Sequence, residues 1–164
     1  MGVAVRPGVP MATLALTVAG GVLALLGTYW DEAWHTHVGR DSFFSPPHLA
    51  LYAGVVVALA GVWWWAVRVQ RVAGRAALRR NRPLLVAGAG AATTLVAGPI
   101  DEAWHAAFGR DSVLWSPPHM LGVIGMIALA AGVLAGVSHT RHHRAWSLAL
   151  GAGLVGAALV PVME

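Results

Sequence analysis

Long apolar stretches alternate with short polar segments along the whole chain. Five stretches contain no charged residue, and they cover residues 7–30, 49–67, 83–100, 120–138 and 145–163. A helix needs about 20 mostly apolar residues to cross a hydrocarbon core of about 30 Å. The pattern therefore predicts an all-α membrane protein of about five transmembrane helices.

Composition supports a single membrane domain over residues 1–164. The chain is 57% hydrophobic and 11% charged, whereas about a quarter of a soluble domain is charged. Five spans leave almost nothing for a separate soluble domain, so polar chemistry must lie in short loops and at helix ends. The first apolar stretch follows Arg6, as in a signal peptide, but it ends in Tyr29, Trp30 and Asp31 rather than in a small-residue cleavage site. We therefore expect it to be retained as a span.

Arginine is distributed unevenly between the two sides of the predicted spans. Nine of the eleven basic residues fall on one side, namely Arg6, Arg68, Arg71, Arg75, Arg79, Arg80, Arg82, Arg141 and Arg144. The positive-inside rule makes that side the cytoplasmic side of the cell (inner) membrane, so we expect a cytoplasmic amino terminus and cytoplasmic loops over residues 68–82 and 138–144. A basic chain could also suggest a nucleic-acid partner, but an arginine cluster that joins two spans is more typical of a topology determinant. We expect membrane lipid as a partner and no nucleic acid.

An internal repeat organises the chain. The sequence Asp-Glu-Ala-Trp-His at 31–35 recurs at 101–105, Gly-Arg-Asp-Ser at 39–42 recurs at 109–112, and Ser-Pro-Pro-His at 45–48 recurs at 116–119. Each copy predicts a helical hairpin, over about 11–67 and about 83–138, with an extra span at about 145–163. Both hairpins rise in the same direction, as in parallel repeats about an axis along the membrane normal. Both motifs should then face the non-cytoplasmic side.

Each motif contains one aspartate and two histidines at spacings suited to a metal ion. Residues four apart on a helix share a face, so Asp31 and His35 can bind one ion, and His48 can return to it across the hairpin. The second copy offers Asp101, His105 and His119. Two imidazoles and a carboxylate suit copper, zinc or iron(II) and leave coordination positions open. The chain has no cysteine, which excludes thiolate ligands.

Other interpretations of these residues remain open. Histidine and aspartate at a membrane boundary can be solvated or paired with arginine, but ionisable residues at membrane depth are costly and usually mark function. The occurrence of the same triplet in two hairpins favours metal binding. Glu32 and Glu102 project about 100° from the neighbouring aspartates, so either acidic residue of each pair can be the ligand.

Several further polar and aromatic residues lie near the motifs or in the basic loops. The pairs Arg40–Asp41 and Arg110–Asp111 either orient the ligating imidazoles or form loop salt bridges. Trp34 and Trp104 are expected to be interfacial anchors. We exclude four histidines as ligands, because they have no counterpart in the repeat or lie in a cytoplasmic loop: His37, His139, His142 and His143.

The first motif resembles the signature of the C-type membrane subunit of copper membrane monooxygenases, a family that includes the particulate methane and ammonia monooxygenases. The resemblance rests on Asp31, Trp34-His35, Arg40-Asp41-Ser42 and Phe44-Ser45-Pro46-Pro47-His48. It implies an Asp/His/His copper site at Asp31, His35 and His48. The family's second site, Asn/His/His, corresponds to Asp101, His105 and His119, with aspartate in place of asparagine.

The resemblance implies a copper-binding membrane subunit of a monooxygenase-like complex that oxidises a small hydrophobic substrate, such as methane, ammonia or a short hydrocarbon, with O2. It also implies A-like and B-like partner subunits or a homo-oligomer, and an external electron donor. Two other functions fit the residues alone. One is a membrane carrier of copper or zinc without catalysis. The other is a zinc-dependent membrane hydrolase, in which metal-bound water is the nucleophile.

Overall fold

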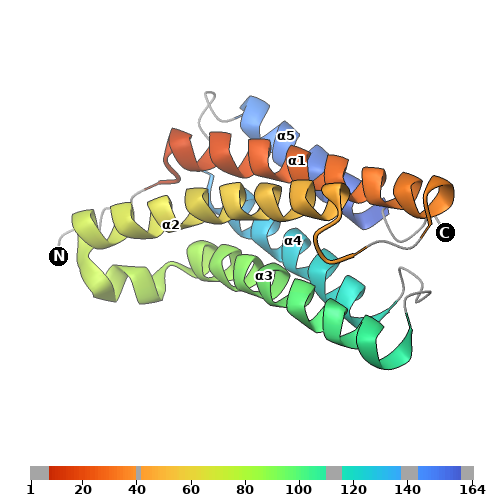
Figure 1. Cartoon of the computed structure of the whole chain (residues 1–164). Helices are drawn as coiled ribbons and strands as arrows, with labels where there is room; N and C mark the ends of the chain where they lie inside the picture. Colours follow the sequence, from red (N-terminus) through yellow and green to blue (C-terminus); the bar gives the residue numbers. More distant parts are fainter. Residues whose placement is uncertain (1–7, 40–41, 110–115, 138–143, 160–164) are drawn as a thin grey trace.

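Five helices make up the described part of the chain, a computed structural model that covers residues 8–39, 42–109, 116–137 and 144–159. They are α1 (Met11–His37), α2 (Pro46–Arg80), α3 (Arg82–Phe108), α4 (Pro117–Gly136) and α5 (Arg144–Leu159) (Figure 1). No strand occurs within these ranges, which confirms the all-α prediction. Outside the described residues lie Arg6, Arg40, Asp41, Arg110, Asp111, Arg141, His139, His142, His143 and the predicted span ends at 7, 138 and 160–163.

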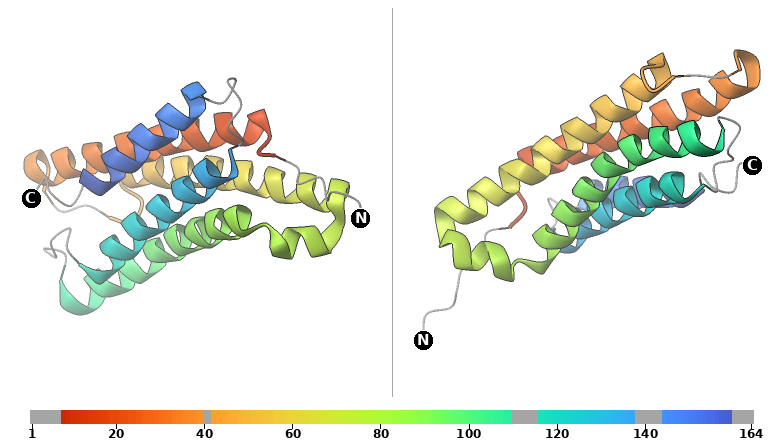
Figure 2. Two further views of the ribbon diagram at one scale, coloured as in Figure 1. Left: turned by 180° about the vertical axis from the view of Figure 1, so that it is seen from behind. Right: turned by 60° about the horizontal axis from the view of Figure 1, so that its bottom comes forward.

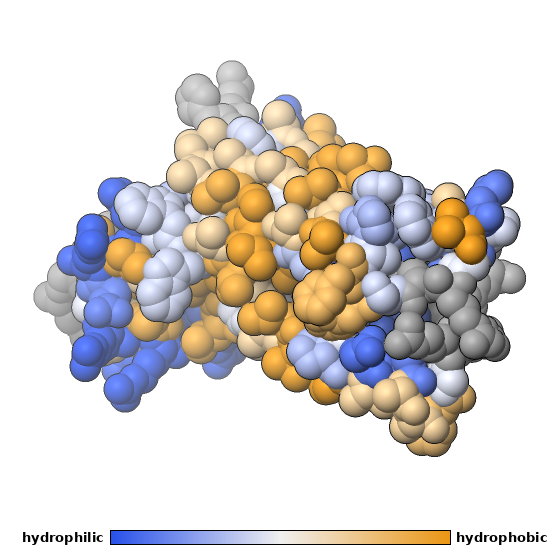
Figure 3. Space-filling model, viewed as in Figure 1, coloured by the Kyte–Doolittle hydropathy of each residue, from blue (hydrophilic) through white to orange (hydrophobic). Residues whose placement is uncertain are grey.

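Four helices are long and apolar enough to cross a bilayer, namely α1, α2, α3 and α4. Large apolar side chains point outward from them, including Leu26 (61% exposed), Trp63 (70%) and Ile124 (60%). On the face drawn in Figure 3, apolar residues cover the middle of the molecule, and hydrophilic residues gather toward both ends. Exposed apolar surface of this extent is what a lipid-facing bundle requires. The chain is a multi-pass membrane protein.

The fifth helix differs from the others in length. The described part of α5 has 16 residues, which corresponds to about 24 Å of helix, less than the hydrocarbon core of about 30 Å. It packs against α4 and α1, so it lies across both hairpins rather than within either one (Figures 1 and 2).

Glycine allows the two helices of each hairpin to approach closely. A Cβ added at Gly20 or Gly54 would overlap backbone atoms of the facing helix. A Cβ at the equivalent positions of the second hairpin, Gly90 and Gly125, would do the same. Threonine adds a hydrogen bond across the first hairpin, from Thr13 Oγ1 to the Gly61 carbonyl (2.9 Å). Small residues at close helix crossings are typical of membrane bundles, where apolar side chains gain little by leaving lipid.

The two hairpins lie side by side with their motif ends together, as the parallel-repeat interpretation predicts (Figures 1 and 2). Equivalent positions of the two copies meet between the hairpins. Trp65 of α2 is 1% exposed, and its indole ring occupies the space beside Gly136 of α4, its counterpart at an offset of 71 residues. Contact between equivalent residues is expected near the axis that relates two parallel repeats.

The arginine-rich segment between the hairpins is helical, although the sequence predicted a loop over residues 68–82. Helix α2 continues to Arg80 and is broken only at Gly74, where φ is 77° and ψ is 174°. Arginine, alanine and leucine are good helix formers, so the apolar span extends beyond the bilayer without interruption until glycine adopts its positive φ. Asn81 then begins α3, because its side chain accepts a hydrogen bond from the Leu84 amide (3.2 Å).

Candidate metal centre

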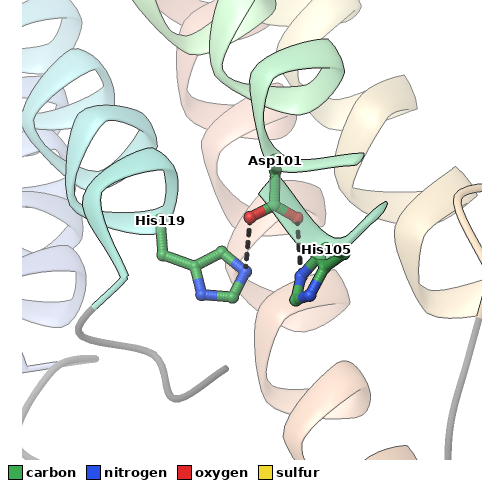
Figure 4. A group of neighbouring side chains, drawn as sticks. All are labelled: Asp101, His105 and His119. Atoms are coloured by element: carbon green, nitrogen blue, oxygen red, sulfur yellow. Dashed lines mark ion pairs between the residues drawn. The ribbon is translucent and has the colours of Figure 1, made fainter. Parts of the chain in front are cut away.

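The second triplet converges on one point at the end of the second hairpin. Asp101 and His105 lie one turn apart on α3, and His119 lies in the first turn of α4. His105 Nε2 is 3.2 Å from Asp101 Oδ2, and His119 Nε2 is 3.3 Å from Asp101 Oδ1 (Figure 4). One ligand atom from each residue lies within 4.8 Å of the others, and no other group of this kind occurs among the described residues.

The distances suit a small metal ion. Ligand atoms bound about 2.0–2.1 Å from a tetrahedral ion lie roughly 3.3–3.4 Å from one another. The two nitrogen–oxygen distances in this group, 3.2 and 3.3 Å, are close to that value. Asp101 Oδ1 is buried and makes no hydrogen bond of good geometry, although His119 Nε2 is near it. The donor set and its spacing therefore fit a metal ion with two nitrogen ligands and one oxygen ligand.

A backbone carbonyl orients one imidazole of the second triplet. His105 Nδ1 donates a hydrogen bond to the Gly109 carbonyl (3.3 Å), so the lone pair of a neutral imidazole lies on Nε2, the atom that faces Asp101. Two acceptor atoms at this distance repel each other unless a cation, either a proton or a metal ion, lies with them. Metal-ligating histidines commonly donate their other ring nitrogen to a carbonyl in this way.

The first hairpin shows the same arrangement for two of its three residues. His48 Nε2 is 3.3 Å from Asp31 Oδ1, and both side chains are mostly buried, at 14% and 16% exposure. His48 Nδ1 donates to the Ser42 carbonyl (3.0 Å), which again leaves the Nε2 lone pair facing the carboxylate. His35 is exposed and does not join the other two within 4.8 Å. The structure thus brings together two residues of the first triplet and all three of the second.

The Ser-Pro-Pro-His segment places the third ligand of each triplet. Ser45 and Ser116 are the N-cap residues of α2 and α4, with prolines in the next two positions. Neither serine side chain caps its helix. The second proline offers no amide to such a cap, since proline has no N–H. The rigid start nevertheless fixes the first turn, and His48 and His119 each lie in it.

The acidic neighbours and the excluded histidine occupy different places. Asp101, rather than Glu102, forms the group with the two imidazoles, and Asp31, rather than Glu32, pairs with His48. His37 is exposed and its Nδ1 donates to the Ala33 carbonyl of its own helix (2.8 Å). Trp34 packs edge-on against Trp30, and Trp104 packs against Phe108. Aromatic pairs at this level agree with a role at the membrane boundary.

One residue of this region was missed by the sequence analysis. Tyr52 lies one turn after His48 on α2, and the two rings pack at a centroid distance of 5.8 Å. The Tyr52 ring also contacts Phe43 (5.1 Å) and lies 3.5 Å from the position of a Cβ built on Gly98 of α3. Two features of the sequence could have indicated Tyr52. It lies four residues after His48, on the same helix face, and the equivalent position of the second copy is Val123.

The arrangement at the end of the second hairpin can hold a divalent ion, with coordination positions left for water or another ligand. Comparison of the chain with protein-family models, with curated proteins and with solved structures finds no match.

Proposed function

We propose that this chain is a copper-binding integral membrane subunit of a monooxygenase-like complex that oxidises a small hydrophobic substrate with O2. The observation that supports it best is the convergence of His105, His119 and Asp101 around one point, with ligand-atom spacings of 3.2 and 3.3 Å. Both imidazoles direct Nε2 toward the carboxylate. The resemblance of both motifs to the copper sites of the C-type monooxygenase subunits supplies the choice of metal and reaction.

Residues of the chain set the charge of the site and the orientation of its imidazole lone pair. Asp101 contributes one negative charge, which offsets part of the charge of a divalent ion, and the Gly109 carbonyl keeps the lone pair of His105 on Nε2. Bound copper would supply the activation of O2, because three protein ligands leave positions open. Electrons and further subunits, A-like and B-like or a second copy of this chain, would come from outside it.

The proposed location is the cell (inner) membrane, with the amino terminus and the arginine-rich segment cytoplasmic and both triplets on the other side. Reporter fusions after Gly39 and after Gly74 separate the two ends of the first hairpin. A cytoplasmic signal from the Gly39 fusion, or an external signal from the Gly74 fusion, would invert this orientation.

A second candidate, a zinc-dependent hydrolase, is favoured by the ligand set itself. Two histidines and one carboxylate with an open position are also the protein ligands of hydrolytic zinc enzymes. In that case zinc rather than copper would occupy the Asp101 group, and no O2 would be consumed. A non-catalytic carrier shares the same ligands but would release its metal reversibly to an acceptor.

Metal analysis of the purified chain tests the proposal. The wild type, His119→Ala and His37→Ala are compared after membrane extraction and exposure to copper or zinc. His119→Ala should lose one bound copper per chain, while His37→Ala should match the wild type, because His37 is exposed and its Nδ1 donates to the Ala33 carbonyl of its own helix. Equal metal loss from both variants, or no copper in the wild type, would refute copper binding at this group.

Oxidation chemistry needs a separate measurement. Copper-loaded protein with its co-purified partners should consume O2 when a quinol and a short hydrocarbon are supplied, and His119→Ala should not. A protein that retains zinc through purification and hydrolyses an ester without O2 uptake would favour the hydrolase instead.

A further inference from the structure

An apolar cavity of about 420 Å³ lies at membrane depth between the two hairpins and α5. All five helices contribute to its wall, among them Gly21 and Leu25 of α1, Val55 of α2, Met126 and Leu129 of α4, and Leu150 of α5. Pockets that bind small molecules commonly measure roughly 300–1,000 Å³ and are mainly apolar. The cavity is therefore large enough for a small ligand.

The wall of the cavity offers a ligand almost no hydrogen-bonding group. Two lining residues, Thr17 and Thr94, carry hydroxyl groups. Thr94 Oγ1 already donates to the Gly90 carbonyl (3.0 Å). Thr17 Oγ1 has less than 1 Å² of accessible surface, so it does not reach the cavity space. A polar or charged ligand would lose its hydration here without compensation, whereas an aliphatic one would not.

The wall of the cavity reaches the lipid-facing surface. Val22, which lines it, is 52% exposed, and Ala149 and Ala152 on α5 are also exposed. Val22 belongs to α1, which is long and apolar enough to cross a bilayer, and Ala149 and Ala152 belong to α5, which packs against α1 and α4. A ligand can therefore enter from the bilayer, in which aliphatic molecules are already concentrated.

We infer that this cavity binds an aliphatic chain of small size taken up from the bilayer, either a free hydrocarbon or the acyl chain of a lipid. Thr94 lies on its wall seven residues before Asp101 on α3, which corresponds to about 10 Å along the helix. The cavity thus lies about two helical turns from the candidate metal group. The binding of an aliphatic chain in the cavity does not depend on the proposed function. Only the further role of the cavity, to hold an oxidisable substrate before it reaches the metal group, rests on that function.

The glycines allow the cavity to be filled without disturbing the helices. A Cβ built on Gly21 or Gly153, both in the cavity wall, meets no atom within 4 Å. Gly88 and Gly151 have equally open surroundings but do not line the cavity, so they are matched controls on α3 and α5. The filling variant is Gly21→Leu with Gly153→Leu, and the control variant is Gly88→Leu with Gly151→Leu.

The test is photo-crosslinking of the full chain in lipid nanodiscs after chelation of metal, followed by peptide mapping. One probe is a short alkane that carries a diazirine, and the other is a phospholipid with a diazirine in one acyl chain. Labelling at Met126 and Leu150 is compared with labelling at Leu95, which is half exposed on α3 and outside the cavity.

Labelling at Met126 and Leu150 should exceed that at Leu95, fall about tenfold in the filling variant and persist in the control variant. Competition by unlabelled decane would identify a free hydrocarbon as the ligand, and labelling by the phospholipid probe that decane does not reduce would identify a lipid chain. Equal labelling of the cavity residues and Leu95, or labelling unaffected by filling, would overturn the inference. Because the protein is metal-free, these outcomes do not depend on the proposed copper site.

Discussion

The two hairpins are alike where they pack and different where they bind. At membrane depth both use glycine at equivalent positions, Gly20 with Gly90 and Gly54 with Gly125, to bring their helices into contact. At the motif end the second hairpin gathers all three predicted ligands, whereas the first gathers only Asp31 and His48. Repeated sequence therefore specifies the same backbone twice but not the same side-chain arrangement.

The residues that surround the candidate ligands differ between the two hairpins. In the first hairpin Tyr52 packs on His48, while the second hairpin has Val123, which is buried, at the equivalent position. In the second hairpin Pro99 interrupts the hydrogen bonds of α3 two residues before Asp101, while α1 has Tyr29 there. His105 packs against His119 at a ring-centroid distance of 5.8 Å. A pair of ligands already in contact needs less rearrangement to close around an ion.

The largest expected effect concerns what the hairpins share. Gly54→Val and Gly125→Val should each destabilise the fold by about 3 kcal/mol or more, because the added side chain meets backbone atoms of the facing helix. Unfolding in increasing proportions of denaturing detergent measures the loss. Gly88→Val is the control and should be unchanged, since its surroundings are open. A tolerated valine in either hairpin would show that the two are not packed alike.

The sequence predicted the shared part of the molecule better than the part that differs. Apolar stretches, arginine placement and the repeat were enough for the helices and hairpins, because each depends on residue type along one segment. The helical course of residues 68–80 differs from the predicted loop, because arginine is a good helix former and a run of charge does not by itself end a helix.

At the site, spacing located the six predicted ligands at the motif ends of the hairpin helices, but it could not determine side-chain rotamers. His35 and His105 occupy equivalent positions and have identical local motifs, yet one is exposed and the other half-buried. Their orientation depends on contacts with residues distant in sequence. The sequence also could not predict that the Ser42 and Gly109 carbonyls orient the imidazoles, because every residue has a backbone carbonyl.

Removal of the carboxylate charge should give the next largest effect. Asp101→Asn should weaken Cu(II) and Zn(II) binding at the second hairpin by about 100-fold and leave Cu(I) binding nearly unchanged, since a neutral ligand attracts a divalent ion less strongly. Metal titrations under oxidising and reducing conditions make the comparison, with Asp31→Asn as the counterpart. Unchanged relative affinities for Asp101→Asn would mean that Asp101 is not a ligand, and Glu102 would replace it as the candidate.

The two hairpins should also differ in affinity when both are intact. His35 must give up its present contacts and rotate before it can join Asp31 and His48, whereas the second triplet is already assembled. Ordering one such side chain costs about 0.5–1.5 kcal/mol, which corresponds to roughly a 2- to 10-fold weaker first site. Titration of His119→Ala reports the first hairpin alone, and titration of His48→Ala reports the second alone. Equal affinities in the two variants would remove the distinction between an assembled and an open triplet.

The smallest effect should come from Tyr52, the residue that most clearly separates the two binding ends. Tyr52→Val gives the first hairpin the residue that the second hairpin has, and it removes the ring that packs on His48 and lies beside Gly98. Loss of one ring contact of this kind costs about 0.7 kcal/mol, so metal affinity of the first hairpin should fall about threefold while that of the second stays unchanged. Tyr52→Phe keeps the ring and removes only the hydroxyl, so it should bind metal like the wild type. If Tyr52→Phe lost as much affinity as Tyr52→Val, the hydroxyl group rather than the ring would be what positions His48.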